Sequence, residues 1–296
     1  MLHPTKIILL PLLLLPLFAF GSRSRACSEA SPASATDSVA FNSTAYLALV
    51  DSADAAGAAS QWGKAIGFLR SAMRLEPANP SNILLLTNVG MMQFYQGQDD
   101  EAIATLTDAV AFDSLNTDVL MRRARVLNSL GRLPEALRDY QAVIDIDSTA
   151  VGAIVQRAFI YLNTNRLELA EADLSHALSL APDDPEATLG RAIILSSSGH
   201  PDEAIPLYSR LIALEPSPEL YAARATCYLV LENLGRASSD IMDGLALDPD
   251  YGELYLCRSA LNKLRYSNDD ALADARRAAA LGIDPRRIYA LTGIKP

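Results

Sequence analysis

The sequence has 296 residues, of which 50 % are hydrophobic, 20 % charged and 6 % aromatic. That length and apolar content suffice for a sizeable core, and apolar content dominated by alanine and leucine favours packed helices over a β-sheet. The formal net charge is −10, from 35 acidic and 25 basic residues. This balance argues against a nucleic-acid partner, because phosphate binding needs a basic face.

Residues 1–26 are predicted to be a secretory signal peptide. Lys6 precedes an apolar run from residue 7 to 20, which is too short to span a bilayer. Ser24 and Ala26 are small residues two apart, directly before Cys27, and match a cleavage site. We therefore expect an exported protein, in the periplasm or anchored on an envelope membrane.

Cys27 leaves two alternatives open. Ala26-Cys27 resembles the end of the lipobox of bacterial lipoproteins, whose cysteine carries a lipid anchor. Ser24 and Arg25 depart from that motif, and ordinary cleavage is the alternative. Residues 27–42 are rich in serine and alanine without an apolar helical stripe, which predicts a flexible tether.

Residues 43–285 carry a pattern that recurs about every 34 residues. Arg123-Ala124 is followed 34 residues later by Arg157-Ala158 and after another 34 by Arg191-Ala192. Apolar residues between these positions recur at steps of three and four, the helical period. One small residue recurs in each predicted second helix, at steps of 37, 34, 34, 34, 33 and 34 residues: Ala65, Ala102, Ala136, Ala170, Ala204, Ala237 and Ala271. A period of this size predicts an array of helix hairpins.

The pattern resembles that of the tetratricopeptide repeat (TPR) family, whose unit is a pair of antiparallel helices. The resemblance covers residues 43–285 and implies an all-α fold, a right-handed superhelical solenoid of about seven hairpins. The expected units are residues 46–79, 83–116, 117–150, 151–184, 185–217, 218–251 and 252–285, and residues 286–296 form a C-terminal tail that shields the final helix.

Turn residues separate the predicted helices. Glycine, or asparagine in its place, ends four first helices, where a left-handed cap conformation is expected: Gly97, Gly131, Asn165 and Gly199. Proline follows four second helices: Pro77, Pro182, Pro216 and Pro249. Ser114 and Ser148 replace that proline in two units, where we expect them to cap the next helix.

Arginine and aspartate recur at facing positions of the predicted hairpins. The arginines are Arg123, Arg157, Arg191, Arg224 and Arg258, and the aspartates are Asp139, Asp173, Asp240 and Asp274, with Leu207 in the remaining place. One interpretation is a ladder of ion pairs, because a buried arginine is usually paired. The other is a basic stripe that binds an anionic ligand, for which Arg191 would be the most available.

The sequence offers no set of residues for catalysis or for a cofactor. His176 and His200 are not spaced as metal ligands, and no CxxC, HExxH, P-loop or GxGxxG motif is present. Pairs of aspartates at 99–100, 183–184 and 269–270 precede predicted helices, where acids cap and complement the helix dipole. Cys227 and Cys257 are expected to be buried single thiols, and a bridge between them is possible only if their backbones approach closely. We therefore predict no enzyme activity, no cofactor and no metal.

The resemblance implies that the first helices line a concave groove that binds an extended peptide or a partner helix. The groove would be rather apolar, and the alternative is that its apolar residues pack between units. By position in the repeat, the expected lining is Thr87, Met91, Phe94, Met121, Arg125, Asn128, Val155, Phe159, Leu162, Leu189, Ile193, Ser196, Ala222, Thr226, Leu229, Leu256, Ala260 and Lys263.

The function that this resemblance implies is a non-catalytic protein–protein interaction scaffold. The second hypothesis is an envelope assembly factor or co-chaperone that carries client proteins, which a broad groove with methionines would suit. An enzyme subunit is the third and has the least support. The identity of the partner protein is not encoded in a recognisable motif.

Overall fold

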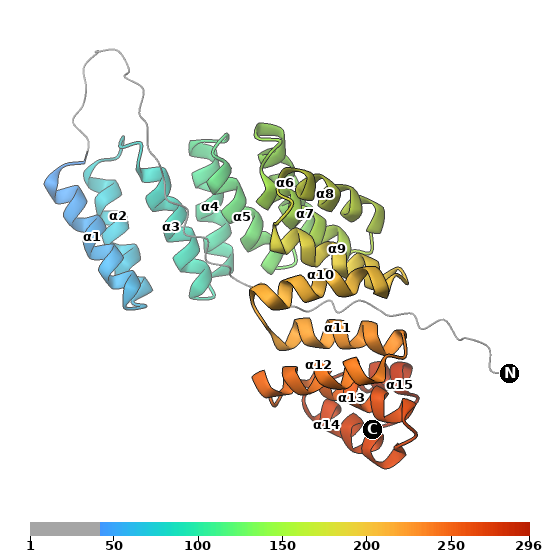
Figure 1. Ribbon diagram of the computed structural model, residues 1–296. Coiled ribbons are helices and arrows are strands. Elements are labelled where there is room, and N and C mark those ends of the chain that lie inside the picture. Colours follow the sequence, from blue (N-terminus) through green and yellow to red (C-terminus); the bar gives the residue numbers. More distant parts are fainter. Residues whose placement is uncertain (1–41) are drawn as a thin grey trace. The chain divides into compact units, whose positions relative to one another are not determined.

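The computed structural model describes residues 42–296, which divide into two compact units, residues 42–160 and residues 161–296. The expected signal peptide, Cys27 and all of the expected tether except residue 42 lie outside the described residues. The described residues form fifteen α-helices and no strands (Figure 1). None of these helices combines the length and the apolarity that crossing a membrane requires.

The unit of residues 42–160 is a stack of helix hairpins in which α1 packs on α2, α3 on α4 and α5 on α6. The seventh helix begins in this unit and ends in the other. The bounds are α1 Thr44–Ala58, α2 Trp62–Leu75, α3 Asn82–Tyr95, α4 Asp99–Phe112, α5 Thr117–Ser129, α6 Leu133–Ile146 and α7 Val151–Asn163.

The unit of residues 161–296 has the same construction, with α9 packed on α10, α11 on α12 and α13 on α14. A final short helix packs on α13 and α14. The bounds are α8 Leu167–Leu180, α9 Pro185–Ser197, α10 Pro201–Leu214, α11 Pro218–Val230, α12 Leu234–Leu247, α13 Gly252–Leu264, α14 Asn268–Ala280 and α15 Pro285–Thr292.

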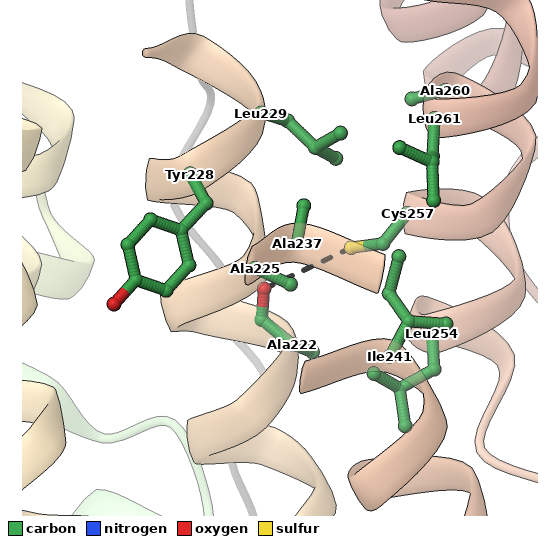
Figure 2. Packing of buried hydrophobic residues seen from close by; sticks show 10 residues of the cluster. All are labelled: Ala222, Ala225, Tyr228, Leu229, Ala237, Ile241, Leu254, Cys257, Ala260 and Leu261. Carbon is green, nitrogen blue, oxygen red and sulfur yellow. Dashed lines mark hydrogen bonds between the residues drawn. The ribbon is translucent and has the colours of Figure 1, made fainter. Parts of the chain in front are cut away.

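Small residues lie where helices approach each other. The seven recurring alanines of the second helices are all completely buried, as the repeat pattern predicted. Gly90 of α3 takes the equivalent place in a first helix, and a Cβ built on it would lie 2.7 Å from Cγ of Leu106. A larger side chain at such a position overpacks the contact. Figure 2 shows one such core, in which Ala222 and Ala225 of α11 face Ala237 of α12 and Leu254 of α13.

The hairpin turns use the left-handed backbone conformation. Gly97, Gly131, Asn165 and Gly199 all have positive φ, which confirms the predicted caps. The turns of other hairpins reach the same conformation with residues that pay a steric cost for it: Ser60, Glu232 and Tyr266. The geometry of the hairpin therefore imposes this conformation even where glycine is absent.

Two expectations about helix ends need correction. Asn116, and not Ser114, caps α5, because its side chain accepts a hydrogen bond from the Val119 amide. Asp147, which precedes Ser148, accepts hydrogen bonds from Thr149 in the loop before α7. Ser114 and Ser148 each lie three residues before the first residue of the following helix, too early in the loop to be its N-cap.

The first hairpin is closed by Glu76, at the end of α2. Its carboxylate accepts hydrogen bonds from the backbone amides of Asn42 and Ser43, each at 2.8 Å, just where α1 begins. The side chain of Asn79 donates to the same carboxylate. Hydrogen bonds from Ser43, with others from Asn42 and Asn79, lower the pKa of Glu76 to about 2. The entry of the chain into the repeat array is thus fixed by one acidic side chain.

The C-terminal tail contains a short helix. Asp284 is the N-cap of α15, because its carboxylate accepts a hydrogen bond from the Arg286 amide, and the helix ends before Gly293, which is in the left-handed conformation. Ile288 of α15 is completely buried against the last hairpin, and Arg287 forms an ion pair with Glu253 of α13. This helix covers apolar surface that the final hairpin would otherwise expose.

Candidate protein-binding surface

First helices of neighbouring hairpins contact each other in both units. In residues 42–160, α3 contacts α5, and in residues 161–296, α11 contacts α13. Each unit therefore presents a surface made of first helices. All residues that the repeat positions predicted for the groove lie on first helices.

Many of the predicted lining residues are buried and cannot line an open groove. Thr87 is 1 % exposed, and its hydroxyl donates to the Ile83 carbonyl on its own helix. For these residues the alternative of packing within the array is the correct one, because side chains at every third or fourth place of a first helix turn inward. The buried set is Thr87, Val155, Leu162, Ile193, Ala222, Leu229, Leu256 and Ala260.

The other predicted residues stay partly or fully accessible. Met121 reaches towards α7, since a Cβ built on Gly152 would lie 3.8 Å from its Cε. Arg125 and Lys263 are exposed, and Arg125 forms no ion pair within the described part of the chain. The partly buried set is Met91, Phe94, Met121, Asn128, Phe159, Leu189, Ser196 and Thr226. Whether these residues contact a partner stays a prediction.

The predicted arginine–aspartate ladder is present in three hairpins. Arg123 donates to Asp139 at 2.7 and 2.8 Å, and Arg224 donates to Asp240 at 2.7 and 2.9 Å. Arg258 donates to Asp274 at 2.6 to 3.1 Å. Nε and Nη2 of each guanidinium donate to one carboxylate, which is the strong bidentate geometry. Arg157 and Asp173 lie in different units.

The arginines also reach the second helix of the preceding hairpin. Nη1 of Arg123 donates to the Thr107 hydroxyl at 3.4 Å, and Nη1 of Arg224 donates to the Ser209 hydroxyl at 2.8 Å. Nη1 of Arg157 lies 2.5 Å from Oε1 of Gln141 in the same way. Each guanidinium therefore joins two successive hairpins, and it does so on the side of the second helices. The sequence pattern revealed the pairing within a hairpin but not this second link.

The arginine–carboxylate pairs leave little unpaired positive charge for an anionic ligand. A cleft of about 230 Å³ in residues 42–160 is lined by Arg123, Arg132 and Arg138 together with Glu135 and Asp139. Arg132 donates two hydrogen bonds to Glu135, which raise the pKa of Arg132, and Arg123 is held by Asp139. Arg191, opposite Leu207, forms no ion pair within residues 42–296. The ladder interpretation thus holds for the hairpins in which both partners lie in one unit.

Reactive side chains do not converge in the described residues. No group of three or more metal-ligating side chains occurs there, and His176 and His200 are exposed on separate elements. Cys227 and Cys257 are free and buried, as expected, and burial raises the pKa of the Cys227 thiol to about 12 and that of Cys257 to about 11. The Cys257 thiol donates a hydrogen bond to the Ala222 carbonyl (Figure 2). It forms a second hydrogen bond with the Thr226 hydroxyl. Such thiols behave as small apolar side chains.

Sequence reasoning missed one exposed aromatic cluster. Trp62 at the start of α2 contacts Tyr95 at the end of α3, with ring centroids 5.7 Å apart, and Phe94 lies 6.1 Å from Tyr95. Tyr95 is 61 % exposed. Tyr95 ends α3 four residues before the acidic run Asp99 to Glu101, and this neighbourhood in the sequence is a signal that the repeat pattern does not explain.

Comparison with known proteins agrees with this architecture. Models of the tetratricopeptide repeat match residues 90–151 and 166–227. A crystal structure of a tetratricopeptide repeat protein from Parabacteroides merdae superposes with a TM-score of 0.66 at 28 % identity, covering 85 % of this chain and 98 % of that one. The chain is thus similar to tetratricopeptide repeats in two segments of its sequence, and to a tetratricopeptide repeat protein in the fold of most of its length.

Two curated proteins show the same likeness over part of their length. Human tetratricopeptide repeat protein 13 is 33 % identical over 143 residues, which is 47 % of this chain and 17 % of that protein. A tetratricopeptide repeat and J domain-containing co-chaperone of Fusarium oxysporum is 27 % identical over 197 residues, or 62 % of this chain and 38 % of that protein. The chain thus spans less than half the length of either relative.

Proposed function

We propose that the protein is a non-catalytic scaffold that binds a peptide or a helix of a partner protein on the surface of its first helices. The observation that carries the proposal is the row of accessible apolar side chains on that surface, among them Met91, Phe94, Met121 and Phe159. Apolar residues that stay accessible in a structure with so many buried ones favour a docking surface. The flanking Arg125 and Asn128 supply polar contacts that would orient the bound segment.

The proposal is tested by identifying the partner through crosslinking in the native cell and repeating the capture with variants. Phe94→Asp and Phe159→Asp each place a charge on the proposed surface and should abolish capture. Leu214→Asp is the matched control, because Leu214 is 64 % exposed at the end of a second helix. Capture that survives both phenylalanine variants would exclude the surface of first helices.

A second candidate function is that of a co-chaperone or envelope assembly factor that carries several clients. Its support is the likeness to a fungal protein named as a co-chaperone, together with the methionines Met91 and Met121, which adapt to different bound side chains. Crosslinking distinguishes the two functions, since a scaffold yields one dominant partner and a carrier yields many.

We further propose that the protein is exported to the periplasm or the envelope membrane. The support is the sequence of residues 1–26, with a lysine before an apolar run and small residues before Cys27. Mass spectrometry of the mature N-terminus tests the proposal. A diacylated Cys27 establishes the membrane anchor, a free N-terminus at Cys27 or later establishes simple export, and an intact Met1 refutes export.

A further inference from the structure

Exposed aromatic side chains gather at one edge of residues 42–160. Trp62 begins α2, and Phe94 and Tyr95 end α3, so the three rings lie beside the turns of two successive hairpins. The ring centroids of Trp62 and Tyr95 are 5.7 Å apart, and those of Phe94 and Tyr95 are 6.1 Å apart. Tyr95 is 61 % exposed, while Trp62 and Phe94 are half-buried. Each ring therefore keeps accessible surface.

Three carboxylates without ion-pair partners in the described residues follow the aromatic residues of α3 in the chain. α4 begins at Asp99, four residues after Tyr95, and its first turn consists of Asp99, Asp100 and Glu101. None of the three forms an ion pair within the described residues. Arg132 of the next hairpin donates two hydrogen bonds to Glu135, which are the main cause of its raised pKa. The charge of Asp100 raises the pKa of Arg132 further.

Charge is segregated along this part of the chain. Residues 75–121 contain seven acidic residues and no lysine, arginine or histidine, whereas five arginines follow in residues 122–138. All charged side chains of the second hairpin, α3 with α4, are therefore acidic. A long acidic stretch on a folded hairpin attracts cationic segments, and it repels other acidic surfaces.

Acids at the start of a helix have a structural explanation, because they complement the helix dipole. The equivalent turn of α10 carries Asp202 and Glu203, but Ser196 and Ser197 of α9 stand where Phe94 and Tyr95 stand here. The dipole accounts for the acids in both places. It does not account for the accessible aromatic rings at the end of α3, just before the acids of α4 in the chain, and these rings favour a bound partner.

We propose that Trp62, Phe94 and Tyr95, together with the carboxylates of Asp99 and Glu101, bind a basic segment of the partner protein that also carries apolar side chains. Lysine or arginine would lie over a ring face and beside a carboxylate, and the apolar side chains would cover the remaining ring surface. This inference rests on the proposed scaffold function and adds the chemistry of the partner. In this proposal, Asp99 and Glu101 form an acidic end of the binding surface of first helices.

The test uses two synthetic peptides of equal length, one alternating arginine with leucine and one alternating glutamate with leucine. Trp62 is the only tryptophan of the chain, so its emission reports directly on this site. The arginine peptide is expected to change the Trp62 emission in a saturable manner, with affinity that falls as salt is raised. The glutamate peptide is expected to leave it unchanged. Equal binding of the two peptides would overturn the proposal.

Variants locate the binding, with anisotropy of the labelled arginine peptide as the readout. Asp99→Asn combined with Glu101→Gln should raise its Kd roughly fivefold, the effect of two accessible charge pairs. Tyr95→Ser should weaken binding while all charges remain. Asp202→Asn combined with Glu203→Gln is the matched control, which removes the same number of charges from the first turn of α10 and should leave the Kd within about twofold. An equal loss in this control would mean general charge attraction and would overturn the site.

The failure of this inference is distinguishable from failure of the scaffold function. Phe159 lies outside the aromatic cluster, so Phe159→Asp tests the scaffold surface alone. If Phe159→Asp abolishes capture of the crosslinked partner while the Asp99 and Glu101 variant captures it normally, the scaffold function stands and the basic-segment inference is wrong. If both variants abolish capture and the arginine peptide binds as expected, both proposals stand.

Discussion

Replacement of Asp240 by alanine tests what the arginine–aspartate ladder contributes to stability. The Asp240 side chain is 5 % exposed and that of Arg224 is 17 % exposed, so the pair is nearly withdrawn from solvent. Asp240→Ala removes the hydrogen bonds of 2.7 and 2.9 Å and leaves the guanidinium with the Ser209 hydroxyl. The hydrogen bonds that Arg224 donates to the Asp240 carboxylate also raise the pKa of Arg224, so the pair favours the charged form of Arg224.

The expected loss follows from the burial of the pair. Removal of one partner from a fully buried ion pair costs about 3 to 5 kcal/mol. Arg224 keeps some solvent access and lies 5.8 and 6.0 Å from the rings of Tyr221 and Tyr228, so a smaller loss applies here. We expect the free energy of unfolding to fall by about 2 kcal/mol.

Urea unfolding followed by circular dichroism at 222 nm measures this loss. Asp243→Ala is the control, because Asp243 lies on the same helix, is exposed and forms no ion pair in the described residues, so it should cost less than about 0.5 kcal/mol. Replacing both Arg224 and Asp240 by leucine should recover most of the stability, since no charge is then left buried. The reasoning is refuted if Asp240→Ala costs no more than Asp243→Ala.

Three further predictions concern packing, pH and thiol reactivity. Gly90→Ala should destabilise the protein by about 1 to 2 kcal/mol in the same assay, because the new Cβ meets Leu106 at 2.7 Å and the Ala102 carbonyl at 3.3 Å. Gly67→Ala is the control and should not destabilise the protein, because a Cβ at that position has no neighbour within 4 Å. The pKa of Glu76 is lowered from 4.5 to about 2, so the contribution of its carboxylate to folding stability is complete above pH 4.5 and is lost as the pH falls towards 2. Glu76→Gln should therefore lower the melting temperature at neutral pH and have little effect on it near pH 2. An equal effect at both pH values would contradict the linkage. In a Cys27→Ser variant, Cys227 and Cys257 should not react with Ellman's reagent until the protein unfolds, and rapid native reaction would show that they are accessible.

The architecture was predictable from the sequence because every repeat unit has the same steric requirements at the same positions. Ala136 and Ala170 recur at a fixed interval since each second helix must admit a close neighbour, and both are completely buried. Gly131 and Asn165 were recognisable as left-handed caps. Glu232 and Tyr266 were not, because nothing in their side chains favours that conformation.

The candidate surface was predictable in position but not in accessibility. Repeat position places Thr87 and Phe94 on the same first helix, yet Thr87 is buried and Phe94 is partly accessible. That difference depends on the size of the residues on the neighbouring helices, which a single position does not encode. The contact between Trp62 and Tyr95 joins two hairpins across 33 residues, and such long-range contacts carry no local sequence signature.

The most direct measurement of the central claim is hydrogen–deuterium exchange of the protein alone and with the partner identified by crosslinking. A partner that covers the surface of first helices slows exchange in α3 and α5 and leaves the second helices α4 and α6 as they were. Protection concentrated in the second helices, or no protection in either set, would contradict the account.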